Sequence, residues 1–358
     1  MANRSSQNED QNFITREETK SKKAEIDAKI KENVVTSGTI FIIKFADILN
    51  ANNSSPEVIS HYMQRVLHSI FFIGYVSKPR VYPEEFIPEK ILESFKEKFP
   101  GPFKDYLSHV PHQTPYSILL EFMSENKNCN EPKILMQELW EINKSLWKTD
   151  TNIGYQPVAN DFTATVIAYS CYGDINGNNN VNSAYGSSIS CKGRVPRRIM
   201  IHISVLQVWD LAISYAVCQE GDSPALVFPN QVCCKAYNFH CNSNCFLEVP
   251  PCAKCMKSFR GVKFNPPCEN PDDDPTWPYG NCAENESLNK LLKGCQDLRS
   301  RILTEKNIQG KQMDIIEIET MFKKEKEEKL KKNLKNLLGS QNITLRKDNR
   351  KLQSFQPM

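Results

Sequence analysis

The 358-residue sequence lacks any hydrophobic run long enough to cross a membrane as a helix. Its longest apolar stretches, near Thr39–Ile43 and Ile70–Val76, fall well short of the about 20 residues that a transmembrane helix needs. The first residues contain no apolar stretch, so no secretory signal peptide is expected. A net charge of +3 is too small to indicate nucleic-acid binding and excludes only a strongly acidic protein. These absences predict a protein without a membrane partner, located in the cytoplasm or the nucleus.

Cysteine is the residue that the sequence has in excess. Thirteen are present, and an odd number without a secretion signal argues against a disulfide framework. Nine of the thirteen lie between Cys233 and Cys295. In a reducing compartment, such a density indicates metal ligation or reactive thiols.

Composition divides the chain into four segments. Residues 1–32 are polar, with too few large apolar side chains to offset the entropy of ordering, and are expected to be disordered. Residues 33–150 are expected to form a helical domain, residues 151–304 an α/β domain, and residues 305–358 a charged helical tail. The helical domain carries no motif with chemistry, and we interpret it as a packing or protein-interaction domain.

Hydrophobic periodicity predicts the main elements. A helix should begin at Ser55-Pro56, with apolar residues recurring at three and four up to a stop near Gly74. Further helices are predicted over Tyr116–Met123, after Asn130, over 205–217 and over 282–303. Strands are predicted over Thr163–Tyr169, Ile199–Val205, Ala225–Phe228 and Phe246–Val249, with a loop over Asp174–Asn182. Strands that alternate with helices indicate an α/β layered fold.

Two short strings carry the chemistry. Pro251-Cys252-Ala253-Lys254-Cys255 follows a predicted strand, and Asn281-Cys282-Ala283-Glu284 begins a predicted helix. Thiols at positions i and i+3 lie on one side of a first helical turn, where the free N–H groups favour thiolates. Cys252, Cys255 and Cys282 would hold Zn²⁺ and leave its fourth position open for water. Zinc lowers the pKa of that water to about 7, and Glu284 would carry its proton to a leaving amine.

These residues resemble the zinc-dependent cytidine deaminase superfamily, whose signature pairs Cys-x-Glu or His-x-Glu with Pro-Cys-x-x-Cys. The resemblance covers roughly residues 155–300, and its specific part about 35 of them. It implies a deaminase-like mixed sheet flanked by helices, with zinc between two helix N-termini. It also implies hydrolytic deamination of a nucleobase, with Glu284 as the catalytic proton shuttle. Trp277 and Tyr279 flank that glutamate and could stack on the base.

The two halves of the motif stand in the reverse of the family's usual order. A permuted connection allows this, because both helix starts can still converge on one metal. A second frame keeps the usual order: the segment 180–186 is similar to the one that precedes the zinc cysteine in nucleoside deaminases, and Cys191 would be the ligand. Gly193 then stands where the catalytic Glu belongs, so this frame predicts an inactive protein. We prefer the reversed frame because its motif is complete.

Other interpretations remain open. Asn281 and Glu284 are spaced as a capping box, in which Glu284 would only hold a backbone N–H. Cys282 could be a small buried hydrophobe. A closed structural zinc could instead be bound by Cys241, Cys245, Cys252 and Cys255, with Cys233, Cys234, Cys268, His202 and His240 as further candidates. The protein would then be a non-enzymatic, zinc-stabilised module that binds other proteins through its N-terminal helices or its tail.

Charge is unevenly distributed along the chain. Residues 323–351 contain eleven Lys and Arg against four Asp and Glu, a net charge of +7, so the rest of the chain is net acidic. A basic tail of this kind can attract RNA or single-stranded DNA. We expect a solvated helix that fades into a disordered basic end and that can be deleted without loss of fold or zinc. The acidic run 272–274 is expected to be a solvated turn. The base, and the choice between nucleoside and polynucleotide, stay open.

Overall fold

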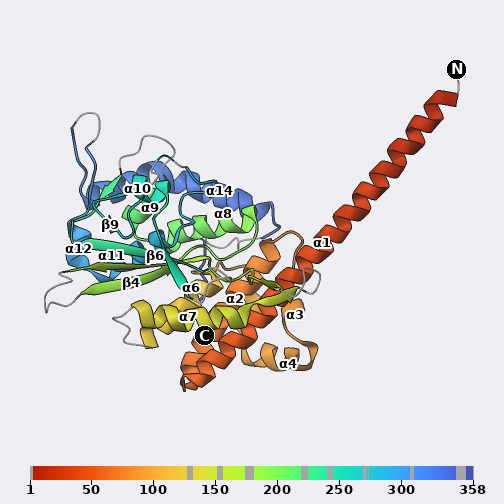
Figure 1. Cartoon of the computed structure of the whole chain (residues 1–358), viewed down its shortest axis with the longest axis horizontal. Coiled ribbons are helices and arrows are strands. Elements are labelled where there is room, and N and C mark those ends of the chain that lie inside the picture. The colour runs from red at the N-terminus through yellow and green to blue at the C-terminus, as the bar shows by residue number, and fades with distance from the viewer. Residues whose placement is uncertain are drawn as a thin grey trace.

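The computed structural model describes residues 3–126, 132–150, 156–173, 181–218, 225–239, 245–268, 272, 274–306, 310–343 and 352–357. Side chains are described from residue 21 onward, apart from residues 126, 148–150 and 156–158. The described chain is a mixed α/β structure, in which helices surround an open mixed sheet (Figure 1).

The elements follow one another in two groups. The N-terminal helices are α1 (Asn3–Ala51), α2 (Pro56–Val76), α3 (Pro83–Phe86), α4 (Glu89–Lys98), α5 (Pro100–Asp105), α6 (Pro115–Asn126) and α7 (Pro132–Leu146). The later helices are α8 (Arg194–Ile203), α9 (Leu211–Val217), α10 (Ala253–Ser258), α11 (Ala283–Gly294), α12 (Gln296–Ser300), α13 (Ile315–Met321) and α14 (Glu327–Gly339), with π-helical turns η2 (Ser204–Val208) and η3 (Phe322–Lys326). The strands are β1 (Lys148–Asp150), β2 (Gln156–Val158), β3 (Val166–Tyr172), β4 (Asn182–Ser187), β5 (Leu226–Val227), β6 (Val232–Phe239), β7 (Phe246–Val249), β8 (Phe259–Arg260), β9 (Lys263–Phe264) and β10 (Leu303–Thr304).

The first helix is longer than the sequence suggests. It includes residues 3–32, for which composition predicts disorder, and it projects from the body as a single rod (Figure 1). Its second half is anchored by Phe41, Phe45 and Leu49, which are fully buried, and the Glu- and Lys-rich turns before them are good helix formers. Contrary to the expectation from the apolar runs, the part Ser21–Ala51 is long and apolar enough to cross a membrane by length and composition. Phe41, Ile42, Phe45 and Leu49 of this part are buried in the protein.

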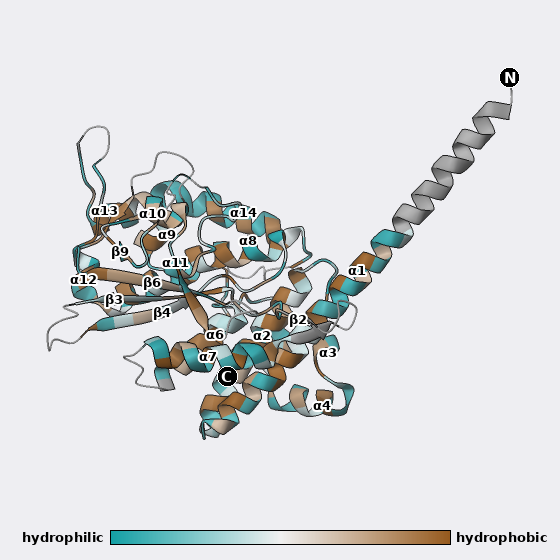
Figure 2. Ribbon diagram, in the orientation of Figure 1, coloured by the Kyte–Doolittle hydropathy of each residue, from teal (hydrophilic) through white to brown (hydrophobic). Residues whose placement is uncertain are grey.

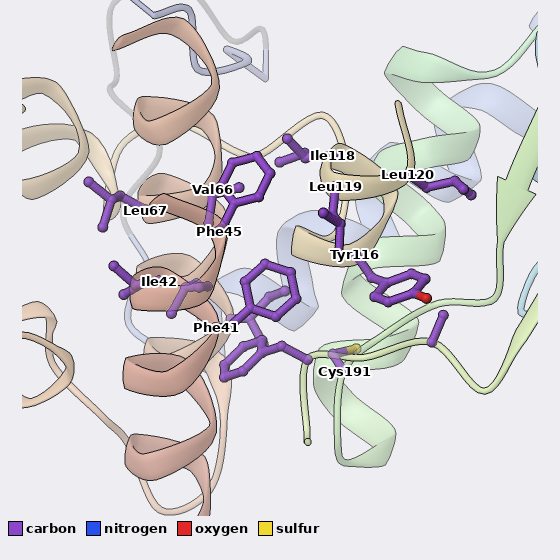
Figure 3. Packing of buried hydrophobic residues seen from close by; sticks show 14 of the residues in the cluster. Phe41, Ile42, Phe45, Val66, Leu67, Tyr116, Ile118, Leu119, Leu120 and Cys191 are labelled. Atoms are coloured by element: carbon purple, nitrogen blue, oxygen red, sulfur yellow. The ribbon is translucent and has the colours of Figure 1, made fainter. Parts of the chain in front are cut away.

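The predicted helices of the N-terminal half are confirmed. Ser55 caps α2 by accepting a hydrogen bond from the Val58 N–H at 3.4 Å. The helix continues past Gly74 to Val76, because this glycine provides room for the Phe86 ring rather than a stop. Apolar faces of α1, α2 and α6 meet in one core, seen from close by in Figure 3 and as inward brown faces in Figure 2.

The main sheet has the order β4-β3-β6-β7, with antiparallel neighbours, and β9 lies parallel to β6. The predicted strands near 163–169, 225–228 and 246–249 are present, the first shifted to Val166–Tyr172. Alternate residues of β3 face opposite cores: Ile167 packs with the N-terminal helices, and Ala168 with the later ones. On that second face, α11 lies directly against β3 and β4.

One predicted strand is wrong. Residues 199–205 form the end of α8 and the start of η2 rather than a strand. The isoleucines at 199, 201 and 203 alternate, but the buried set Pro196, Ile199, Met200 and Ile203 also recurs at helical spacing. Proline in the first turn of a helix favours that alternative. The predicted helix over 282–303 divides into α11 and α12 at Cys295, and residues 174–180 of the predicted loop lie outside the described residues.

The C-terminal segment also differs from expectation. Instead of a solvated helix, α14 packs against α8 and buries Leu334 and Leu338. Beyond it, Ser354 forms a parallel bridge with Val110, and the Phe355 ring stacks on His68 with centroids 4.0 Å apart. Deleting residues 306–358 would therefore remove part of the core. Residues 344–351, which contain four of the basic side chains, lie outside the described residues.

Candidate metal centre

Three thiols converge where two helices begin. Cys252 precedes α10, Cys255 lies in its first turn, and Cys282 precedes α11. The Cys252 sulfur lies 3.7 Å from that of Cys255 and 3.4 Å from that of Cys282, and all three lie within 4.8 Å of one another. Sulfurs bound to one tetrahedral zinc at 2.3 Å are about 3.8 Å apart. The three thiols therefore fit a common metal ion.

The backbone around the thiols explains why they meet. Strand β7 pairs with β6, and Pro250 and Pro251 connect its end to Cys252 and the first turn of α10. Before α11, Gly280 has a φ of +85° and passes so close to Ile201 and Val217 that a Cβ would lie 2.9 Å from each. The carbonyl of Asn281 then accepts a hydrogen bond from the Ile189 N–H at 3.0 Å, which fixes the start of α11 to the segment after β4.

The three thiols shift one another's pKa. Hydrogen bonds from Cys255 and Cys282 hold the pKa of Cys252 far below the usual value of a thiol. Hydrogen bonding with Cys252, together with burial, raises the pKa of both Cys255 and Cys282. A bound metal ion would displace the thiol protons of the cluster, as metal binding to thiols normally does.

Glu284 lies beside the cluster and is buried, with 4% of its surface exposed. Burial raises its pKa to about 7, and the negative charge of Cys252 adds to this. Hydrogen bonds from its own backbone N–H and from the Cys255 thiol act in the opposite direction. The capping-box interpretation is wrong: α11 begins after Cys282 without any side-chain cap, and the Asn281 Oδ1 is buried without a hydrogen-bond partner among the described residues.

A cavity of about 620 Å³ opens beside the cluster. Its wall includes Cys252, Cys282, Glu284 and the indole of Trp277, which donates a hydrogen bond to the Cys282 sulfur at 3.2 Å. Tyr279, predicted beside Trp277 as a base-stacking residue, is not part of this wall. It packs with the second core, and its ring faces the Lys254 ammonium at 5.2 Å.

The cavity contains polar residues that the motif did not indicate. Arg197 comes from α8, Asn238 from β6, and Asn281 from the turn before α11. Cys268 also lines the cavity. No local spacing connects Arg197 with the cysteine motif, because only the tertiary packing of α8 brings it there.

Two of the alternative ligands, Cys191 and His202, stand apart from this cluster. Cys191 is buried in the core beside Tyr116 (Figure 3), and burial raises its pKa to about 12. Burial likewise lowers the pKa of His202, whose ring contacts the Arg198 carbonyl at 2.7 Å. Within the described ranges, no group other than Cys252, Cys255 and Cys282 brings three such ligands together. His240 and Cys241 lie outside the described residues.

No family model, curated protein or solved structure matches the chain.

Proposed function

We propose that the protein is a zinc-dependent hydrolase that deaminates a nucleobase, carried by a nucleoside, a nucleotide or a nucleic acid. The observation that carries the proposal is the placement of a buried carboxyl, Glu284, beside three converging thiols, two of which line the same cavity as Glu284. Bound zinc would supply a Lewis acid that makes water nucleophilic at neutral pH. Cys252, Cys255 and Cys282 would hold it.

Glu284 would move the protons. A buried carboxyl, whose pKa burial raises toward neutrality, can accept a proton from water and return it, which suits a general acid and base. Its carboxylate would take one proton from the attacking water and pass it to the ring nitrogen, and would then carry the proton of the new hydroxyl group to the exocyclic nitrogen. The ring carbon gains an oxygen and loses ammonia, so water and amine are converted to carbonyl and ammonia. Trp277, which is fixed by its bond to Cys282, offers an aromatic face for the base.

A structural zinc site is the second candidate, and Cys268 is the observation that favours it. Its thiol lines the same cavity and could close the coordination as a fourth sulfur. The protein would then bind partners through its N-terminal helices or its C-terminal segment. Cys268→Ser separates the two proposals. It should leave zinc and activity unchanged in an enzyme but weaken the metal in a closed four-cysteine site.

The experiment that tests the enzyme is a paired metal and ammonia measurement on purified full-length protein. Zinc per chain is counted for the wild type, Glu284→Gln and Cys252→Ser. Ammonia release is then followed with cytosine, adenine and guanine nucleosides, their monophosphates, and single-stranded RNA and DNA. We expect about one zinc in the wild type and in Glu284→Gln, with ammonia only from the wild type. Equal ammonia release by Glu284→Gln would refute the assigned role, and zinc-loaded wild type that releases none would refute the enzyme.

A further inference from the structure

Arg197 is the charged residue that the proposed chemistry does not use. It lines the cavity of the cysteine cluster, and its Nε is buried without a hydrogen-bond partner among the described residues. No carboxylate of the described chain forms an ion pair with it, whereas Arg65 pairs with Glu121 and Arg299 with Asp210. Keeping one N–H of a guanidinium away from water without an acceptor is costly, unless a ligand supplies that acceptor.

The neighbouring cations do not take this role. Lys254 donates its ammonium hydrogens to the carbonyls of Pro275 and Trp277, at 2.8 and 2.7 Å, and so holds the loop of the cavity wall. Lys257 pairs with Asp274 at 3.5 Å. Among the residues described in the cavity wall, Arg197 is the only Lys or Arg. A planar guanidinium with an unpaired Nε–H and no carboxylate partner suits a phosphate or a carboxylate, which can accept two of its hydrogens.

We infer that Arg197 anchors the phosphate of a nucleoside monophosphate whose base lies against Trp277. The inference rests on the proposed function, which supplies a nucleobase as the reacting group. It adds that the nucleobase is carried by a nucleoside with one phosphate. A volume of about 620 Å³ is within the usual range for small-ligand sites and has room for base, sugar and one phosphate. The buried Oδ1 of Asn281 is a second polar group without a partner in the described chain, and it can accept from a sugar hydroxyl or an amine.

The charges favour one phosphate over a polynucleotide. Binding a strand requires several Lys or Arg residues along its backbone, and the described cavity wall offers one. The segment that enters the wall at Pro275 also carries Asp274 and the exposed Asp272, which would repel further phosphates. The ligand is therefore a mononucleotide rather than RNA or single-stranded DNA.

Binding to an inactive protein tests the anchor separately from catalysis. Zinc-loaded, full-length Glu284→Gln is titrated calorimetrically with cytidine, adenosine and guanosine, with their 5′-monophosphates, and with single-stranded RNA and DNA oligonucleotides. The same titrations are repeated after adding Arg197→Gln or, as a matched control, Arg194→Gln, which changes an exposed arginine of the same helix. Melting temperature and zinc content establish that each variant is folded.

We expect one monophosphate to bind at least about tenfold more tightly than its nucleoside, since charge-assisted hydrogen bonds are lost without the phosphate. Arg197→Gln should abolish that difference, and Arg194→Gln should keep it. Equal binding of nucleosides and monophosphates, or equal effects of the two arginine variants, would overturn the anchor. Tight binding of single-stranded oligonucleotides alone would overturn the mononucleotide. If the wild type releases no ammonia but the Arg197-dependent preference is present, the deaminase proposal fails and the anchor stands. If the wild type releases ammonia from nucleosides and the phosphate does not strengthen binding, the anchor fails and the deaminase proposal stands.

Discussion

Gly186 of β4 lets the backbone of α11 pack closely against the sheet, and Gly186→Ala should disturb the cysteine cluster at the start of that helix. A Cβ at this position of β4 would lie 2.2 Å from the Ser287 nitrogen and 2.6 Å from the Ala283 carbonyl oxygen. Ordinary contact begins near 3.4 Å, so β4 and α11 would have to separate by about 1 Å. The obstructing atoms are backbone and cannot rotate away. We therefore expect a loss of about 3 kcal/mol in the free energy of unfolding, at the upper end for overpacked cores.

The displacement should also weaken the metal site. Cys282 immediately precedes α11, and a shift of about 1 Å exceeds the about 0.2 Å that metal–ligand distances tolerate. Urea unfolding would measure the stability, and competition with a chromophoric chelator would measure the zinc affinity. Gly294→Ala is the matched control, because this exposed glycine at the end of the same helix has no atom within 4 Å of its Cβ position. It should be neutral or stabilising by up to about 1 kcal/mol. A Gly186→Ala protein that matches this control in both measurements would refute the reasoning.

Three further predictions follow from the buried groups. Cys252→Ser should abolish the rise in melting temperature that zinc causes. Cys191→Ser is the control, since it also changes a buried thiol, and it should keep that rise. Equal loss of the rise in both variants would contradict the three-cysteine site. Burial lowers the pKa of His68 to about 3, so below pH 6.5 protonation favours the unfolded chain. Stability should fall by up to about 1.4 kcal/mol per pH unit on acidification, and His68→Leu should flatten this slope in urea titrations at neutral and acidic pH. Leu334→Ala should cost about 2–4 kcal/mol because α14 is part of the core, and a change below 0.5 kcal/mol would show α14 to be a solvated tail.

The sequence was sufficient where the signal is local. Ser55 and Pro56 specify the start of α2, because a cap and a first-turn proline act within four residues. The same holds for Cys252 and Cys255, whose spacing in a first helical turn places both thiols on one side. Such short-range rules need no knowledge of the rest of the chain.

Local rules failed where a pattern fits two structures. The alternating isoleucines of residues 199–203 are compatible with a strand and with a helix, and only the core that receives them selects α8. The same limit applies to α14: its charge suggested solvation, but two leucines four residues apart are enough to fix one face when a partner helix is present.

In the candidate site, too, some features follow from the local sequence and others only from the tertiary structure. Sequence motifs named the three thiols and Glu284, because two closely spaced cysteines after a proline and a Cys-x-Glu at a helix start are a pattern that suits metal binding. Tertiary structure decided that Cys282 meets Cys252 across 30 residues of chain and that Glu284 is buried rather than capping a helix. It also brought Arg197 and Asn281 into the same cavity. Distances across a fold depend on how strands pair and helices pack, and those long-range contacts leave no periodic trace in the sequence near each residue.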